Sequence, residues 1–248
     1  MSAGLPPPPV PDLSGTSLFL DVDGTLVAIA PRPDAVVVEP GLGDLLGRLG
    51  AAMPGRVALV SGRSVAQLDG MLGEHAQALA VAGSHGAERR TPETGHLRPD
   101  RSDALDAAAA ELRAFADLHD LVFEAKSLGA ALHYRLRPER EDAASAMAEQ
   151  VAAAHGLTLQ RGKMMVEVRL PGDKGGAIRT LIEAEAMAGT RPWFLGDDVT
   201  DEDGFAAAAA LGGAGVLVGP PRPTAARYRL DDVAAVHDWL ARLAERAS

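Results

Sequence analysis

Short segments of mostly apolar residues alternate with helical patterns along the first third of the chain. Residues 18–20, 56–60 and 79–82 form three such segments. Between the first two, leucines recur every three or four positions, which is the period of a helix, at Leu42, Leu45, Leu46 and Leu49. A second helix is predicted over residues 65–72. Strands that are apolar on both sides are typical of a parallel sheet covered by helices on both faces.

The pattern changes in the middle of the chain. Residues 121–127 and 130–136 are two strand-like segments separated by a short turn that contains glycine, which predicts a hairpin. A second hairpin is predicted from residues 157–161 and 164–170. Helical patterns precede each hairpin, over residues 105–116 and 139–154. Two helices and two hairpins predict an α+β unit with an antiparallel sheet, inserted into the α/β pattern.

The α/β pattern resumes at residue 173. A helix is predicted over 173–187, strands over 192–195 and 215–218, and a last helix carries Val233, Val236, Leu240 and Leu243. The predicted fold class is α/β, with a Rossmann-like parallel-sheet core and an inserted α+β cap domain. The domain boundaries expected from these changes are a disordered proline-rich lead-in over 1–14, a core over 15–95 and 173–248, and a cap over 96–172.

Composition narrows the classes of function. The chain has 248 residues, 47% of them hydrophobic, and a formal net charge of −10. An acidic chain is a poor candidate for nonspecific nucleic-acid binding, which needs a basic face. The absence of cysteine excludes disulfides, thiolate metal sites and a cysteine nucleophile. With no apolar run of membrane length and no signal-peptide pattern at the start, we expect a soluble, cytoplasmic, monomeric protein.

Two carboxylates mark the end of the first predicted strand, in the sequence Leu18-Phe19-Leu20-Asp21-Val22-Asp23-Gly24-Thr25. Residues two apart on a strand lie on the same side, so Asp21 and Asp23 can face one small volume. Ligands of open α/β sheets bind at the carboxyl ends of the strands. Two like charges held this close need a shared proton or a cation between them. Mg²⁺, which prefers oxygen ligands, fits this pair.

Reactive groups also follow other predicted strands or begin a helix. Ser61 follows the second strand, Lys174 opens a helix, and Asp197 and Asp198 follow the strand at 192–195. These groups would converge along one edge of a parallel sheet. Together they supply what phosphoryl transfer needs: a carboxylate to attack phosphorus, a cation to shield charge, a hydroxyl and an ammonium for the phosphate oxygens, and an acid for the leaving alcohol.

The order Asp-Val-Asp-Gly-Thr, strand-end serine, helix-start lysine and Gly-Asp-Asp-x-x-Asp resembles the haloacid dehalogenase-like phosphatase superfamily. The resemblance covers the whole chain and includes the position of the inserted cap. It implies that Asp21 is the nucleophile, that Asp23 is the general acid and base, and that Ser61 and Lys174 bind phosphate. It also implies that Asp21, the backbone carbonyl of Asp23, and Asp197 ligate Mg²⁺. Asp198 and Asp201 would support them, although Asp201 equally fits the acidic first turn of a helix.

Alternation sorts the side chains of the predicted cap sheet into two faces. The apolar face would pack on the two cap helices, and a polar face with carboxylates and cations would stay open. The residues expected on this polar face are Glu124, Lys126, His133, Arg135, Glu167 and Arg169. Carboxylates and cations in one concave site suit polyhydroxyl ligands, because each can bind a pair of hydroxyl groups.

Five further motifs make the chain similar to the trehalose-6-phosphate phosphatase family: Gly83-Ser84-His85-Gly86-Ala87-Glu88, Glu124-x-Lys126, His133-Tyr134-Arg135, Val166-Glu167-Val168-Arg169 and Gly196–Glu202. The resemblance implies that Glu124, Lys126 and Glu167 recognise the sugar. It also implies that Arg63, His85, Glu88 and Arg135 line the same cleft.

The resulting hypothesis is a Mg²⁺-dependent phosphatase that releases trehalose and phosphate from trehalose 6-phosphate through an aspartyl-phosphate, the last step of trehalose biosynthesis. Its partner would be this small sugar phosphate, with no nucleic acid and no membrane. Another sugar phosphate, such as sucrose phosphate or mannosyl phosphoglycerate, is the alternative within the same enzyme class. A phospho-accepting signalling domain is the alternative from another class, but Asp23 and the inserted cap both argue against it.

Overall fold

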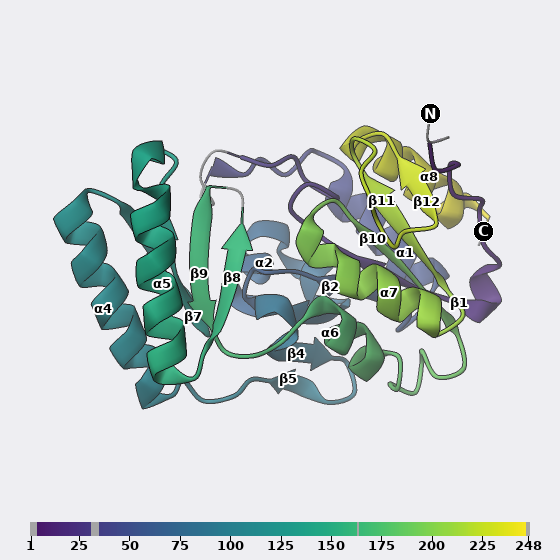
Figure 1. The fold of residues 1–248 in the computed structure, drawn as a ribbon. Coiled ribbons are helices and arrows are strands. Elements are labelled where there is room, and N and C mark those ends of the chain that lie inside the picture. Colours follow the sequence, from purple (N-terminus) through teal and green to yellow (C-terminus); the bar gives the residue numbers. More distant parts are fainter. Residues whose placement is uncertain (1–3, 31–34, 163, 247–248) are drawn as a thin grey trace. The chain divides into compact units, whose positions relative to one another are not determined.

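The computed structural model describes residues 4–30, 35–162 and 164–246 of the chain (Figure 1). The chain forms two compact units. The first contains residues Met1–Leu97 and Gly172–Ser248, and the second contains Arg98–Pro171. The second unit is therefore an insertion into the sequence of the first.

The first unit is built on one eight-stranded sheet with the strand order β12-β11-β10-β1-β2-β3-β4-β5. The six strands from β12 to β3 run parallel, whereas β4 and β5 are antiparallel. The strands are β1 (Thr16–Leu20), β2 (Val57–Val60), β3 (Ala80–Gly83), β4 (Glu88–Thr91), β5 (Gly95–Leu97), β10 (Arg191–Gly196), β11 (Ala214–Val218) and β12 (Tyr228–Leu230). The parallel core is confirmed, but the hydrophobic pattern did not predict β4, β5 or β12. These strands are short and lack a continuous apolar run.

Helices cover both faces of this sheet and bury two separate cores. On one face, Leu18 and Leu20 of β1 pack with α1 (Leu42–Ala52), α2 (Val65–Leu72), α3 (Glu74–Gln77) and α8 (Val233–Glu245). On the other face, Phe19 packs with α6 (Lys174–Leu181) and α7 (Glu202–Ala210). Short 3-10 turns lie at η1 (Leu13–Gly15), η3 (Ser84–Gly86) and η5 (Val199–Asp201). Burial on both faces explains why the parallel strands β1, β2, β3, β10 and β11 are mostly apolar.

The second unit is an antiparallel sheet with two helices on one face. The strand order is β6-β7-β9-β8, with β6 (Val122–Ala125), β7 (Gly129–His133), β8 (Thr158–Gly162) and β9 (Met165–Arg169). The helices α4 (Asp103–His119) and α5 (Glu141–His155) pack on Ala130, Leu132, Val166 and Val168. The short turn η4 (Pro138–Arg140) precedes α5. The α+β prediction is confirmed, with each strand beginning or ending within a few residues of its predicted limits.

Residues 4–14 differ from the expected disordered lead-in. The backbone carbonyl of Pro6 accepts a hydrogen bond of 3.0 Å from the N–H of Arg229 in β12, and the carbonyl of Pro9 accepts one of 3.3 Å from the indole of Trp239. Pro8 is buried, and Val10 packs on the first core. Prolines cannot donate backbone hydrogen bonds, but their carbonyls accept them and their fixed φ favours an extended path. Residues 1–3 lie outside the described residues.

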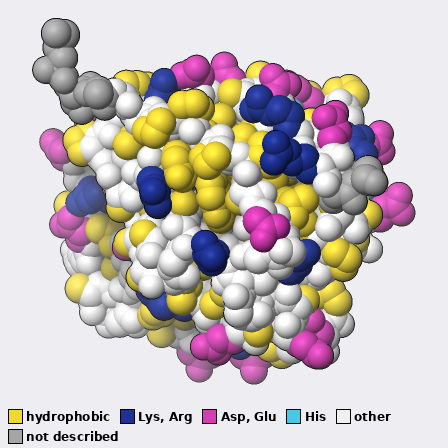
Figure 2. All heavy atoms as spheres, turned by 90° about the vertical axis from the view of Figure 1, so that its right-hand side faces the viewer, with side chains coloured by type: hydrophobic (Ala, Val, Ile, Leu, Met, Phe, Trp, Pro, Cys, Tyr) yellow, Lys and Arg dark blue, Asp and Glu magenta, His cyan; other side chains and the backbone are white. Residues whose placement is uncertain are grey.

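The surface carries charges of both signs. Figure 2 shows basic side chains in small groups among acidic and hydrophobic ones on one face, as expected for a chain with a formal net charge of −10. Among the described residues, no helix is long and apolar enough to cross a membrane.

These contacts predict that the start of the chain contributes to stability. A variant that lacks residues 1–10 should unfold several degrees below the full chain, because it loses two hydrogen bonds and the burial of Pro8 and Val10. Thermal unfolding followed by circular dichroism measures this difference. A variant that lacks only residues 1–4 is the control and should unfold with the full chain. Equal melting temperatures for all three proteins would instead support the expectation that the start of the chain is disordered.

Candidate active site

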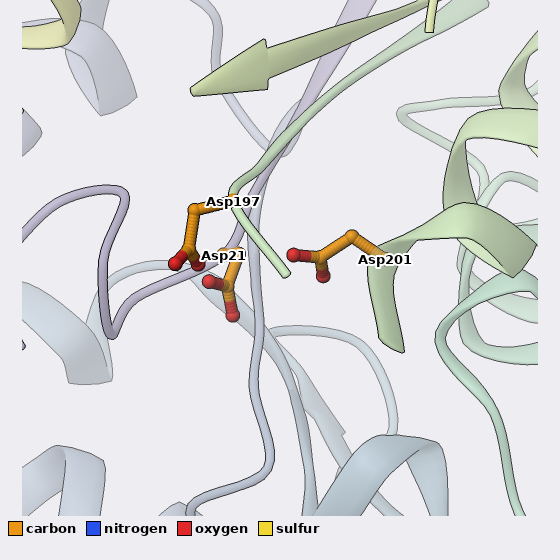
Figure 3. A group of neighbouring side chains, drawn as sticks. All are labelled: Asp21, Asp197 and Asp201. Atoms are coloured by element: carbon orange, nitrogen blue, oxygen red, sulfur yellow. The ribbon is translucent and has the colours of Figure 1, made fainter. Parts of the chain in front are cut away.

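Two carboxylates lie at the carboxyl ends of neighbouring parallel strands. Asp21 directly follows β1, and Asp197 directly follows β10, which pairs with β1. The backbone N–H of Asp21 donates a 3.0 Å hydrogen bond to the carbonyl of Leu195, so pairing continues to the end of both strands. The side chains of Asp21 and Asp197 lie side by side in Figure 3. Asp21 is only 3% exposed, whereas Asp197 is partly buried.

A third carboxylate, that of Asp201, joins this pair from η5. It is fully buried, and its Oδ2 accepts a 2.9 Å hydrogen bond from the N–H of Asp198. One carboxylate oxygen from each of Asp21, Asp197 and Asp201 lies within 4.8 Å of the others. This spacing requires glycine at two places, because a Cβ on Gly24 would lie 2.2 Å from Asp197 and one on Gly196 would lie 2.4 Å from Asp201. Gly24 also has a φ of +87°, which side chains rarely adopt.

Lys174 places an ammonium between two of these carboxylates. It is the first residue of α6 and 4% exposed, and its Nζ donates hydrogen bonds of 2.6 Å to Asp21 Oδ1 and 2.6 Å to Asp201 Oδ1. Asp173 begins the helix by accepting a 2.6 Å hydrogen bond from the N–H of Gly176. Burial lowers the pKa of Lys174, but Asp201 and Asp21 more than offset this, so the pKa lies above its ordinary value and the lysine stays charged.

The cluster has more negative charge than Lys174 neutralises. Burial, together with the charges of Asp201 and Asp197, raises the pKa of Asp21 well above its ordinary value despite the opposing effect of Lys174. Burial, Asp201 and Asp198 raise the pKa of Asp197 to about 7. Asp197 Oδ1 is buried and has no hydrogen-bond partner among the described residues. Three convergent carboxylates with an unpartnered oxygen fit a hard divalent cation, which is bound through oxygen.

Ser61 and Arg63 lie beside this cluster in the sheet order, at the end of β2. Ser61 is 1% exposed, its N–H bonds to the carbonyl of Ala82, and its Oγ accepts a 3.1 Å hydrogen bond from the N–H of Arg63. The guanidinium of Arg63 binds both carboxylate oxygens of Asp23, from Nε to Oδ2 and from Nη2 to Oδ1, each at 2.7 Å. The carboxylate of Asp23 therefore faces Arg63.

The second unit places two paired carboxylates on the sheet face opposite its helices. Ala131 of β7 stands in register between Glu124 of β6 and Glu167 of β9. Glu124 Oε2 lies 2.8 Å from His133 Nε2, and Glu167, which is 3% exposed, accepts a hydrogen bond from Lys126. Glu124 and Glu167 share a sheet face as alternation predicted, but this face is not open throughout, because Glu167 and Arg169 are only 3% and 4% exposed.

The structure gives four of the sequence-predicted residues more definite positions. Arg135 was expected on the polar strand face, but β7 ends at His133 and Arg135 is exposed in the turn that follows. Asp198 is exposed and caps η5 through the N–H of Val199. Glu88, expected in the wall of a cleft, is only 2% exposed. Asp201, for which two roles were left open, belongs to the carboxylate cluster.

Comparisons with known proteins confirm the resemblance. The trehalose-phosphatase family model matches residues 19–234. The chain is 38% identical over 235 residues to the trehalose-6-phosphate phosphatase of Escherichia coli, which covers 93% of this chain and 87% of that protein. It is 37% identical over 216 residues to a probable trehalose-phosphate phosphatase of Sinorhizobium fredii, which covers 86% of this chain and 81% of that protein.

Two solved structures show the same fold. The C-terminal domain of a trehalose-6-phosphate phosphatase of C. albicans superposes with a TM-score of 0.82 at 21% identity, over 99% of each chain. A phosphatase of the haloalkanoate (HAD) enzyme superfamily from Bacteroides thetaiotaomicron superposes with a TM-score of 0.63 at 17% identity, over 91% of this chain and 93% of that one. At these identities the likeness establishes the fold, which is the α/β core with an inserted cap predicted from the sequence.

The crowded carboxylates predict how stability depends on pH and on cations. The pKa of Asp197 is about 7 in the folded chain against 3.8 for an ordinary Asp, so without a cation its contribution favours folding at low pH and is lost as the pH rises through 7. The Asp197→Asn variant should therefore melt several degrees above the wild type at pH 8 in EDTA, and this gain should shrink at pH 5.

Differential scanning fluorimetry with EDTA or Mg²⁺ measures both effects. Mg²⁺ should raise the melting temperature of the wild type at pH 8 by mass action, and it should raise that of Asp197→Asn much less. Asp238→Asn, which removes an exposed carboxylate from α8, is the control and should behave as wild type. A melting temperature of Asp197→Asn at or below that of the wild type at pH 8 would contradict the proposed repulsion.

Proposed function

The chain belongs to the trehalose-phosphatase family, and from this membership and its carboxylate cluster we propose that it hydrolyses trehalose 6-phosphate to trehalose and phosphate. A member of this family is a phosphoric monoester hydrolase. The observation that carries the proposal is the position of Asp21. This residue directly follows β1, and its carboxylate lies beside that of Asp197 and accepts a hydrogen bond from the buried Lys174.

In the proposed mechanism, Asp21 is the nucleophile. One of its carboxylate oxygens attacks phosphorus, the bond from phosphorus to the sugar oxygen breaks, and Asp21 carries the phosphoryl group as an acyl phosphate. Water then attacks this phosphorus, which releases inorganic phosphate and regenerates the carboxylate. The 2.6 Å bond from Lys174 supports this role, because it fixes one oxygen of Asp21 and favours the ionised form.

Asp23 would move the proton in both steps. It donates a proton to the leaving sugar oxygen in the first step and takes one from the attacking water in the second. Its two bonds to Arg63 orient the carboxylate. Ser61 would donate its hydroxyl hydrogen to a phosphate oxygen, and Lys174 would add an ammonium for another. Both residues are buried at the same edge of the sheet as Asp21.

We propose Mg²⁺ as the cation, held by Asp21, Asp197 and the backbone carbonyl of Asp23, with Asp201 beside them. A bound divalent cation would offset the negative charge that builds up when a carboxylate meets a phosphate. Asp201 would hold Lys174 in place rather than react, because its Oδ1 already accepts the bond from Nζ.

The second unit would select the alcohol. Glu124, Lys126 and Glu167 would bind sugar hydroxyls, because a carboxylate accepts and an ammonium donates hydrogen bonds to vicinal hydroxyl groups. The pairs Glu124–His133 and Lys126–Glu167 support this role, since they place polar groups together on the sheet face opposite the two helices. Arg135, exposed after β7, would contact the substrate only at the margin of this face.

The proposed function predicts one pattern of phosphate release. With Mg²⁺, the wild type should hydrolyse trehalose 6-phosphate in preference to glucose 6-phosphate, sucrose phosphate and mannosyl phosphoglycerate, and EDTA should abolish release. Asp21→Asn, which keeps the shape of the side chain, should lose several orders of magnitude in kcat on every substrate. Colorimetric phosphate assays measure all of these rates. A preference for sucrose phosphate or mannosyl phosphoglycerate would show that the proposed substrate is wrong. An active Asp21→Asn would show that Asp21 is not the nucleophile.

The second unit predicts a split between a sugar phosphate and a small phosphate ester. Glu124→Ala, Lys126→Ala and Glu167→Ala should each lower kcat/KM for trehalose 6-phosphate about tenfold to a hundredfold, because sugar hydroxyls lose their partners. The same variants should hydrolyse p-nitrophenyl phosphate almost as the wild type does. Glu149→Ala, which removes an exposed glutamate from α5, is the control. Parallel losses on both substrates would mean that these residues support the fold instead of reading the sugar.

A further inference from the structure

The turn that follows β3 has an unusual backbone. Ser84, His85 and Gly86 have φ values of +49°, +55° and +93° in succession. Only glycine adopts such angles without cost, and two of these three residues carry side chains. Strained backbone persists where surrounding contacts hold it, and it is concentrated at functional sites. The contacts that hold this turn therefore indicate what the turn supports.

On one side, the turn holds the loop of Ser61 and Arg63. The N–H of His85 donates a 2.9 Å hydrogen bond to the carbonyl of Ser61, and the N–H of Ser84 donates one of 2.8 Å to the carbonyl of Arg63. The imidazole of His85 packs so closely that a Cβ on Gly62 would lie 2.6 Å from Nε2. All three residues of this loop are thus fixed by the turn.

On its other side, the same turn packs against the start of α6. A Cβ on Gly86 would lie 2.9 Å from the Cβ of Ala177 and 3.1 Å from the carbonyl of Asp173. Asp173 caps the helix that begins with Lys174. The turn therefore lies between the two groups proposed to bind phosphate, the hydroxyl of Ser61 and the ammonium of Lys174, and its shape sets their separation.

Glu88 holds the turn in this shape. Its carboxylate is buried, with the residue only 2% exposed. Oε1 accepts hydrogen bonds of 2.7 Å from the hydroxyl of Ser84 and 3.3 Å from the N–H of Val65 at the start of α2, and Oε2 lies 3.0 Å from Nε2 of His96 in β5. Burying a carboxylate is costly unless it is bonded, and nothing in the proposed chemistry employs this one.

We propose that Glu88 is a positioning residue for phosphate binding. By bonding Ser84 and the start of α2, it keeps the Ser84–Gly86 turn left-handed, and the turn keeps Ser61 at the distance from Lys174 that the phosphoryl group requires. The proposal rests on the proposed function, since it takes Ser61 and Lys174 as the phosphate ligands. It assigns Glu88 no contact with the substrate.

The test uses inorganic phosphate, the product, as the probe of phosphate binding and p-nitrophenyl phosphate as the substrate. Neither compound requires recognition of a sugar. The experiment compares the wild type with Glu88→Ala, Glu88→Gln and a control, Glu93→Ala. Glu93 is an exposed glutamate in the turn between β4 and β5. For each protein we measure kcat, the inhibition constant of phosphate and the melting temperature. The Gln variant should preserve function, because its Oε1 can accept from Ser84 and Val65 while its amide donates to the other tautomer of His96.

Glu88→Ala should raise the inhibition constant of phosphate about tenfold and lower kcat about tenfold to a hundredfold, since small displacements of positioning groups have effects of this size. Glu88→Gln should stay within about threefold of the wild type, and Glu93→Ala should match it. A Glu88→Ala protein with a lower melting temperature but an unchanged inhibition constant would overturn the proposal, because a merely structural residue gives that result. Equal impairment of Glu88→Gln and Glu88→Ala would also overturn it.

If Glu88→Ala does not fold, Ser84→Ala provides the test, because it removes only the hydroxyl that donates a hydrogen bond to Glu88. It should raise the inhibition constant about threefold, and an unchanged value would refute the proposal. Failure of the proposed function has a different signature, since the wild type itself would then neither hydrolyse p-nitrophenyl phosphate nor bind phosphate.

Discussion

The buried ammonium of Lys174 is the interaction on which the rest of the site depends. Its Nζ bonds Asp21 at the end of β1 and Asp201 in η5, and so links three elements that are distant in the sequence. A lysine at the start of a helix opposes the helix dipole. Two carboxylates within hydrogen-bond distance outweigh that effect, and removal of Lys174 would leave both buried carboxylates without their cation. The position of the cluster therefore depends on electrostatics, whereas the sheet depends on apolar packing.

Three carboxylates and one lysine leave the cluster with surplus negative charge, and this surplus constrains the backbone around it. The carboxylates approach closely only because Gly24 and Gly196 have no Cβ that would displace Asp197 and Asp201. The two apolar cores on either side of the sheet hold the strand ends in place against this repulsion. A divalent cation would relieve it. The stability of the fold and the binding of a cation are thus linked through the same groups.

The sequence predicts the features that depend on local patterns. Apolar segments predicted every parallel strand except β12, and Asp21 and Asp197 follow two of them. The polar strand β4 pairs with the nearby β3 without leaving an apolar signal in the sequence. Other features depend on contacts distant in the sequence. Pro6 is ordered by an N–H of β12. The Gly-Asp-Asp-x-x-Asp motif included Asp201 among the candidate residues. Its bond to Lys174 depends on the turn η5 and could not be predicted from the motif. Alternation likewise could not show that β7 ends before Arg135.

The groups proposed for chemistry and those proposed for specificity lie in different units. Every group proposed to act at phosphorus lies in the first unit, and the three residues proposed to bind the sugar hydroxyls, Glu124, Lys126 and Glu167, lie in the second. In the second unit Lys126 already bonds Glu167, and the ring of His133 already lies within hydrogen-bond distance of Glu124. A sugar hydroxyl would therefore add to a pair that already exists. Binding of this kind favours ligands with several suitably spaced hydroxyls over those with one. In the proposed mechanism the carboxylate cluster acts on phosphorus and makes no contact that depends on the leaving alcohol. Substrate choice would therefore change through the inserted unit while the proposed chemistry at Asp21 stayed the same.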